Sequence, residues 1–133
     1  MKKTVFLLSA LFVIIFFSCC KKNKCTAGLG GKVTIVAYPQ HHVFPILNKS
    51  WYPDTVYLKF NTQNGDSNLA AYNIYFVGEA GENHVHLEGL KCGDYYIYGV
   101  GFDTTISKRV KGGIPYSFDK TSGEIDLNIP VTE

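Results

Sequence analysis

The sequence is short of charged residues, and of arginine in particular. Its 133 residues include 13 basic and 11 acidic side chains, and Arg109 is its one arginine. Nucleic-acid-binding domains usually carry a strongly basic patch, so this near balance argues against nucleic acid as a partner. Beyond residue 25 no long stretch repeats apolar residues every 3.6 positions, which argues against a helical fold. A chain of this length forms about one domain.

The first 18 residues are typical of a secretory signal peptide. Lys2 and Lys3 precede an uncharged apolar run over residues 5–17, which is shorter than a membrane-spanning helix normally needs. Removal of this segment takes away two lysines, so 11 basic and 11 acidic residues remain. We therefore expect an exported protein, and neither a polytopic membrane protein nor a basic nucleic-acid binder.

The residues after the apolar run resemble the lipobox of bacterial lipoproteins. In that motif a small residue precedes a cysteine that is lipidated and becomes the first residue of the mature chain. Ser18 is the small residue if Cys19 is lipidated, and Cys20 is the alternative acceptor. Each buried methylene of an acyl chain contributes about 0.8 kcal/mol, so several chains hold a soluble domain on a bilayer. The resemblance implies attachment to the membrane through an N-terminal lipid.

These signals divide the chain into three segments. We expect a lipoprotein signal peptide over residues 1–18, a lipid-anchored linker over residues 19–31 and a folded domain over residues 32–133. The expected location is the outer membrane of a Gram-negative bacterium, on its periplasmic or surface face.

Export would also permit disulfides. Cys25 and Cys92 are the two cysteines outside the region of the signal peptide. A bond between them would close a loop of about 67 residues and contribute roughly 4 kcal/mol in the chain-entropy description. The sequence alone leaves open whether they are bridged.

Two-residue alternation of apolar and polar side chains recurs along the chain and predicts β-strands. The expected strands cover residues 32–38, 55–60, 72–77, 84–88, 94–102, 107–118 and 124–131. The sixth contains Gly112, Gly113 and Pro115, so we expect it to be bent or to lie at a sheet edge. About seven strands at this spacing predict an all-β domain, a single antiparallel β-sandwich.

A short motif makes the fold prediction more specific. Leu90, Gly93 and Tyr95 form the pattern L-x-x-G-x-Y, which is typical of a tyrosine corner. With the strand that follows, this segment resembles the transthyretin-like sandwiches, which include carboxypeptidase regulatory-like and Cna B-type domains. The resemblance covers about residues 32–131, and its specific part is residues 90–102. It is closest to small bacterial lipoproteins that carry such a domain alone, and it implies an Ig-like Greek key fold and a location, but no activity.

The histidines are the candidate metal ligands. His84 and His86 are two positions apart on an expected strand, so both project from one face. His41 and His42 follow the first expected strand. Neutral imidazoles suit copper and zinc, and two such pairs would complete a site. Whether the pairs meet is left open, since both pairs also fit a solvated surface.

The known activities of related folds do not fit this chain. Transthyretin-like hydroxyisourate hydrolases end in Y-R-G-S, whereas this chain ends in residues 130–133, P-V-T-E. The Lys–Asn isopeptide bond of some Cna B-type domains would need Lys32 and Asn128, but alternation turns Asn128 away from the core. Neither Cys92 nor the scattered aspartates form a recognisable catalytic set. We therefore expect no enzyme activity, and a small hydrolase is the least favoured alternative.

Aromatic residues make up 14% of the chain and offer another surface. Alternation turns Tyr95 and Ile97 to one face and Tyr96 and Tyr98 to the other. The outward tyrosines would join other aromatic side chains in a platform for protein or glycan: Trp51, Tyr52, Tyr57 and Tyr75. The expected function is a lipid-anchored, non-enzymatic binding or accessory module, with a histidine-based copper or zinc lipoprotein as the alternative.

Overall fold

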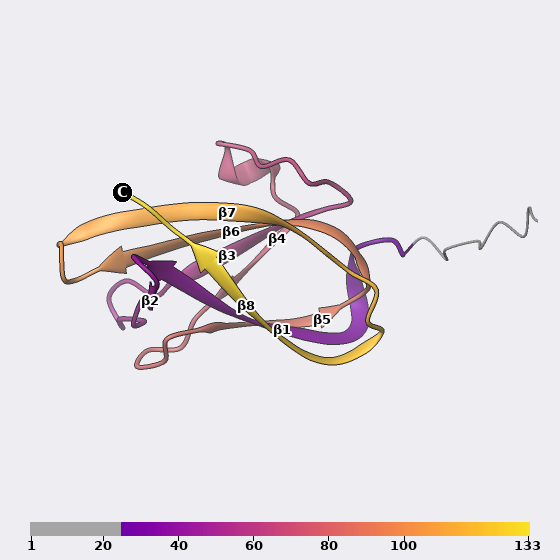
Figure 1. The fold of residues 1–133 in the computed structure, drawn as a ribbon, viewed down its shortest axis with the longest axis horizontal. Coiled ribbons are helices and arrows are strands. Elements are labelled where there is room, and N and C mark those ends of the chain that lie inside the picture. The colour runs from indigo at the N-terminus through magenta and orange to yellow at the C-terminus, as the bar shows by residue number, and fades with distance from the viewer. Residues whose placement is uncertain (1–24) are drawn as a thin grey trace, which may run out of the picture.

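The computed structural model describes residues 25–133, which form two β-sheets packed face to face (Figure 1). The elements are β1 (Leu29–His41), β2 (Phe44–Pro45), β3 (Thr55–Phe60), the 3-10 helix η1 (Leu69–Ala71), β4 (Ile74–Val77), β5 (Val85–Leu90), β6 (Gly93–Asp103), β7 (Lys108–Phe118) and β8 (Ser122–Pro130). The predicted all-β sandwich is confirmed, with β2 as a short additional strand. The expected signal peptide and the candidate lipid sites Cys19 and Cys20 lie outside the described residues.

The strand order places β1 at the centre of the first sheet. It pairs with β5 on one side and with β8 on the other, and its end pairs with β2. The second sheet has the order β4-β3-β6-β7, so β7 is an edge strand, as its glycines and proline predicted. All pairs are antiparallel except β1 and β8, which run parallel from the pair Lys32–Ser122 to the pair Gln40–Pro130. The sandwich is therefore not purely antiparallel.

The core lies between the two sheets and follows the predicted alternation. Val33 and Ile35 of β1, Val56 and Leu58 of β3, and Ile97 of β6 are fully buried. Burying one such side chain contributes about 1.5–3 kcal/mol. Most neighbouring positions on the same strands lie on the outer faces and are half-buried, with Val36 as a buried exception.

A close approach of two backbones fixes the start of β1. Leu90 of β5 is the register partner of both Leu29 and Val33, which marks a bulge in β1. A Cβ atom on Gly31 would lie 1.9 Å from the carbonyl oxygen of Leu90. Only glycine fits at this position.

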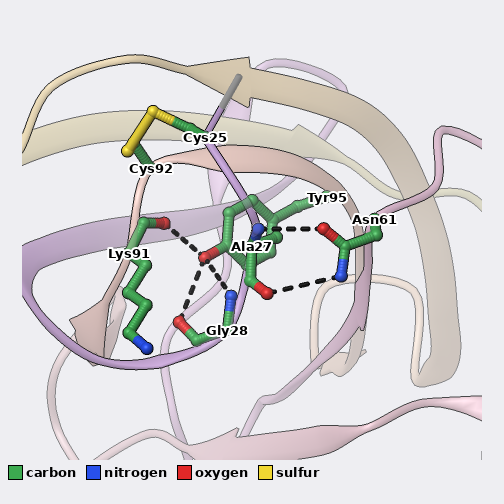
Figure 2. The surroundings of a disulfide bond; sticks show 7 residues. All are labelled: Cys25, Ala27, Gly28, Asn61, Lys91, Cys92 and Tyr95. Carbon is green, nitrogen blue, oxygen red and sulfur yellow. Dashed lines mark hydrogen bonds between the residues drawn. A yellow bond between two sulfur atoms is a disulfide. The ribbon is translucent and has the colours of Figure 1, made fainter. Parts of the chain in front are cut away.

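A disulfide and a buried tyrosine fasten the chain before β1 to the turn before β6 (Figure 2). Cys25 and Cys92 form a disulfide. The fully buried Tyr95 donates its hydroxyl to the carbonyl of Lys91 and accepts the backbone N–H of Gly28 at 3.1 Å. This return of the hydroxyl to the preceding turn is the contact expected of a tyrosine corner.

The two ends of the sandwich differ. Residue 25 lies at one end of the long axis, whereas the β1–β2 hairpin, the β6–β7 turn and the C-terminus lie at the other (Figure 1). His42 and Val43, the two turn residues of the β1–β2 hairpin, both have positive φ values of 49° and 68°. This is the backbone of a tight two-residue hairpin, and it is unusual for valine. Within residues 25–133, no helix is long and apolar enough to cross a membrane.

Candidate metal centre

The outer face of the first sheet carries two of the predicted ligands. Val85 and Leu87 of β5 are fully buried in the core, so their neighbours His84 and His86 project to the opposite, outer face. His86 is exposed and His84 is half-buried against Tyr38 of β1, with ring centroids 5.5 Å apart. The shared face that the sequence predicted for this pair is present.

The two imidazoles bring their Nε2 atoms within 3.1 Å of each other. Glu82, in the turn that precedes β5, adds a carboxylate oxygen 3.4 Å from Nε2 of His84. One ligand atom from each of these three residues lies within 4.8 Å of the other two. They form a compact group of two nitrogens and one oxygen.

The spacing of these atoms suits a single bound metal ion. Zinc binds histidine nitrogen at about 2.0–2.1 Å. Two nitrogens separated by 3.1 Å would then subtend an angle of about 100° at the metal. A separation of 3.4 Å corresponds to about 110°, close to a tetrahedral angle. The group would bind a metal ion without large rearrangement.

A hydrogen bond orients His84 for this role. Its Nδ1 lies 3.1 Å from the side-chain oxygen of Asn83. An amide oxygen only accepts, so in the neutral ring this contact places the proton on Nδ1 and leaves the lone pair on Nε2. A ligating histidine typically donates its other N–H in this way.

Asn48 holds the turn that carries Glu82 and His84. It is almost fully buried, and its side-chain NH2 donates to the carbonyl of His84 at 2.9 Å. Its backbone N–H donates to the carbonyl of Glu82 at 2.7 Å. A Cβ atom on Gly78 would lie 2.4 Å from the amide of Asn48, so glycine leaves the room that this amide needs. Buried hydrogen bonds therefore fix the backbone of two ligands.

The surroundings of the group are acidic. A shallow pocket of about 190 Å³ lies between the edges of β4 and β5, and Glu79, Glu82, His86 and Glu88 line it together with Phe76, Val77 and Gly78. No lysine or arginine lines this pocket. A hollow lined by one sign of charge raises the local concentration of the opposite ion. The approach to the ligand group therefore favours cations.

The four histidines do not form one site. His41 is the last residue of β1 and shares the inward face with Val33 and Ile35, so it is 5% exposed. His84 and His86 lie on the outer face of the same sheet, and the sheet separates the two pairs. His42 is an exposed residue of the β1–β2 turn. The sequence prediction placed His41 and His42 after the first strand, but pairing with β2 extends β1 as far as His41.

Glu82 was missed by the sequence prediction. It lies in the turn before β5 and not in a strand, so alternation gave no reason to choose it. The spacing Glu82-x-His84-x-His86 could have identified it, because every second side chain of an extended chain projects to the same side.

The expected aromatic platform is divided in two. Tyr75, Tyr57 and Tyr98 are register partners across β4, β3 and β6, and the rings of Tyr57 and Tyr75 lie 5.7 Å apart. Trp51 and Tyr52 lie elsewhere and pack on Phe102, with ring centroids at 5.0 and 5.7 Å. Tyr75 and Trp51 are each about 60% exposed, whereas the other rings are half-buried.

A buried acid was also missed. Asp54, just before β3, is fully buried, and neither of its carboxylate oxygens has a hydrogen-bond partner in residues 25–133. Burial raises the pKa of Asp54 to about 7, with the nearby backbone amide of Phe102 opposing the rise in part. Lys32 and Asn128, the two residues weighed for an isopeptide bond, are both exposed on the outer face.

Comparison of the chain with protein-family models, curated proteins and solved structures gives no match. The function is therefore inferred from the residues and their geometry.

Proposed function

We propose that this protein is an exported, lipid-anchored domain that binds a zinc or copper ion through Glu82, His84 and His86, and that it acts by binding and not by catalysis. The observation that carries the proposal is the pair of Nε2 atoms 3.1 Å apart, with the carboxylate of Glu82 3.4 Å from one of them. Two nitrogens and one oxygen match the ligand preferences of both metals.

A metal ion accounts for this arrangement better than a solvated surface does. Without a metal, one imidazole would donate to the other in a position where water competes for the same hydrogen bond. A bound ion would satisfy both nitrogen lone pairs and the carboxylate together. Three protein ligands also leave a coordination position open, and His86 is exposed. These features favour a site that exchanges its metal over a closed structural one.

Copper should bind more tightly than zinc. The order of affinities for divalent metals places copper above zinc for a given set of nitrogen and oxygen ligands. Which of the two occupies the site in the cell depends on its supply in the exported compartment.

Several features support the location in this proposal. The signal-like segment and the lipobox-like cysteines favour export and a lipid anchor in an outer membrane. The disulfide between Cys25 and Cys92 is also typical of an exported domain. The corner formed by Leu90, Gly93 and Tyr95 supports membership of the transthyretin-like group.

Calorimetry tests the metal site. The mature protein, solubilised in a mild detergent, is titrated with zinc and, separately, with copper. We expect one equivalent of either metal to bind, and the double variant His84→Ala/His86→Ala to lose this binding. Glu82→Gln should weaken binding tenfold or more, because a neutral amide is a poorer ligand than a carboxylate.

His42→Ala is the matched control. This histidine is exposed and lies outside the ligand group, so its removal should leave the affinity unchanged. Equal binding by the parent protein and the His84→Ala/His86→Ala variant would overturn the proposal.

The tyrosine row of β4, β3 and β6 favours a second candidate function, a surface that binds protein or glycan. Its support is Tyr75, a large side chain that is about 60% exposed beside Tyr57. Tyr75→Ser should then abolish capture of a partner from outer-membrane extracts, while Trp51→Ser, which changes the other aromatic group, should not.

A further inference from the structure

The anchor-distal end of the sandwich holds a second pocket, separate from the metal group. It has a volume of about 380 Å³, within the usual range for small-molecule sites. The β1–β2 hairpin, the segment after β2 and the β6–β7 turn enclose it, and these elements lie at the end away from residue 25 (Figure 1). Its lining residues are His41, His42, Phe44, Pro45, Ile46, Leu47, Lys49, Asp103, Thr104 and Thr105.

A buried histidine is the polar centre of this pocket. His41 is 5% exposed, and its Nδ1 lies 2.7 Å from Oδ2 of Asp103. The other ring nitrogen, Nε2, makes no hydrogen bond to any residue in the described part of the chain. Because Asp103 fixes the ring, Nε2 is available to a molecule in the pocket.

The carboxylate of Asp103 already has hydrogen-bond partners within the protein. Its Oδ1 accepts the backbone N–H of Thr105 at 2.7 Å and the hydroxyl of Thr105 at 2.6 Å. The Thr105 hydroxyl and, to a smaller extent, His41 lower the pKa of Asp103 to about 2, so this carboxylate is charged at neutral pH. The Nδ1–H of His41 donates to this carboxylate, and a ring protonated at both nitrogens would present a second N–H at Nε2.

The rest of the lining combines one lysine and the polar side chains of His42 and Thr104 with apolar walls. Lys49 forms no ion pair with any of residues 25–133. Phe44 and Leu47 are exposed at the rim, and Ile46 is buried behind them. A molecule with a negatively charged acceptor for Lys49 and an apolar chain for these walls would complement this lining.

We propose that this pocket binds a small carboxylic acid with a short apolar chain. The carboxylate accepts from Nε2–H of His41 and from the ammonium of Lys49. The chain packs along Phe44, Ile46 and Leu47. The volume of the pocket accommodates an acid of about six to ten carbon atoms and not a long-chain lipid.

Hexanoate is the probe, and hexanamide is its neutral counterpart of the same shape. The mature protein in detergent, with histidine rings labelled with 15N and with EDTA present to keep the metal group empty, is titrated with each compound. We expect hexanoate to shift the Nε2 resonance of His41 saturably, and hexanamide to bind at least tenfold more weakly. Equal binding of the two compounds, or no saturable shift of His41, would overturn the proposal.

A pair of lysine variants tests the cation. Lys49→Met should weaken hexanoate binding about tenfold. Lys120→Met should change it less than twofold, because Lys120 is exposed outside the pocket. Both lysines are at least partly exposed, so neither change should unfold the domain. Equal hexanoate affinity in the two variants would remove Lys49 from the site and contradict the proposed recognition.

Discussion

Replacing Asp54 with asparagine tests how the fold accommodates a buried acid. The carboxyl group is fully buried without a hydrogen-bond partner in residues 25–133, and Gly101 leaves the space that it occupies. Burial raises its pKa from 3.8 to about 7 in the folded protein. The folded state therefore holds this proton more tightly than the unfolded state, so ionisation of Asp54 opposes folding.

The magnitude follows from the two pKa values. One pKa unit corresponds to 1.36 kcal/mol, so a change from 3.8 to about 7 corresponds to ~4 kcal/mol. Below pH 4 the carboxyl group of Asp54 is protonated in both states, so its ionisation does not lower the free energy of unfolding. As the pH rises from 4 to 7, the free energy of unfolding of the wild-type protein falls by ~4 kcal/mol because Asp54 ionises more readily in the unfolded state. Above pH 7 this contribution falls no further. Asp54→Asn cannot ionise, so it should gain ~4 kcal/mol relative to the wild type between pH 4 and pH 8.

Urea unfolding measures this difference. Trp51 fluorescence gives the free energy of unfolding of both proteins from pH 4 to pH 8. With a urea dependence of about 1–2 kcal/mol per molar, the midpoints should separate by on the order of 2 to 4 M more at pH 8 than at pH 4. Other titrating groups are common to both proteins and cancel in the difference. A difference in stability that does not change with pH would refute the reasoning.

Three further predictions concern the disulfide and the tyrosine that fasten the chain before β1, and the close approach at the bulge. Replacing both Cys25 and Cys92 with serine should lower the free energy of unfolding by about 4 kcal/mol, since the disulfide spans 67 residues. Thermal unfolding with and without reductant measures this contribution. An unchanged melting temperature would mean that the bond does not stabilise the fold. Tyr95→Phe should cost about 1–3 kcal/mol in urea unfolding, because the N–H of Gly28 and the carbonyl of Lys91 lose their hydroxyl partner. A neutral result would contradict the hydrogen bonds described. Gly31→Ala should strongly destabilise the folded domain. Gly99→Ala should cost less than about 1 kcal/mol, because its added methyl group would meet its neighbours at 3.5 Å or more. Similar melting temperatures for the two variants would be inconsistent with the bulge.

The strands could largely be predicted from the sequence because alternation reports which side chains enter the core. Val85 and Leu87 of β5 are buried and His86 is exposed, as the pattern required. Alternation does not report which strand lies beside which, or in what direction. The parallel pairing of β1 with β8 was therefore missed.

The candidate metal centre was predicted in part for the same reason. His84 and His86 share a face because they lie two residues apart on a regular strand. Glu82 joins them through a turn that is held by the buried side chain of Asn48, and this depends on contacts distant in sequence. Whether His41 meets them was left open by the sequence; pairing of β1 with β2 carries the strand to His41, whose side chain turns inward toward Asp103.

The parallel pairing of β1 with β8 constrains the order in which the domain can fold. β1 is the central strand of its sheet, yet one of its two neighbours is contributed by residues 122–130, about 90 positions later in the chain. Until those residues have been synthesised and have paired with β1, one edge of β1 is open to other extended chains. Contacts of such long sequence separation also make folding slow. A chain cut short before residue 122 should therefore aggregate, because β1 would keep an open edge.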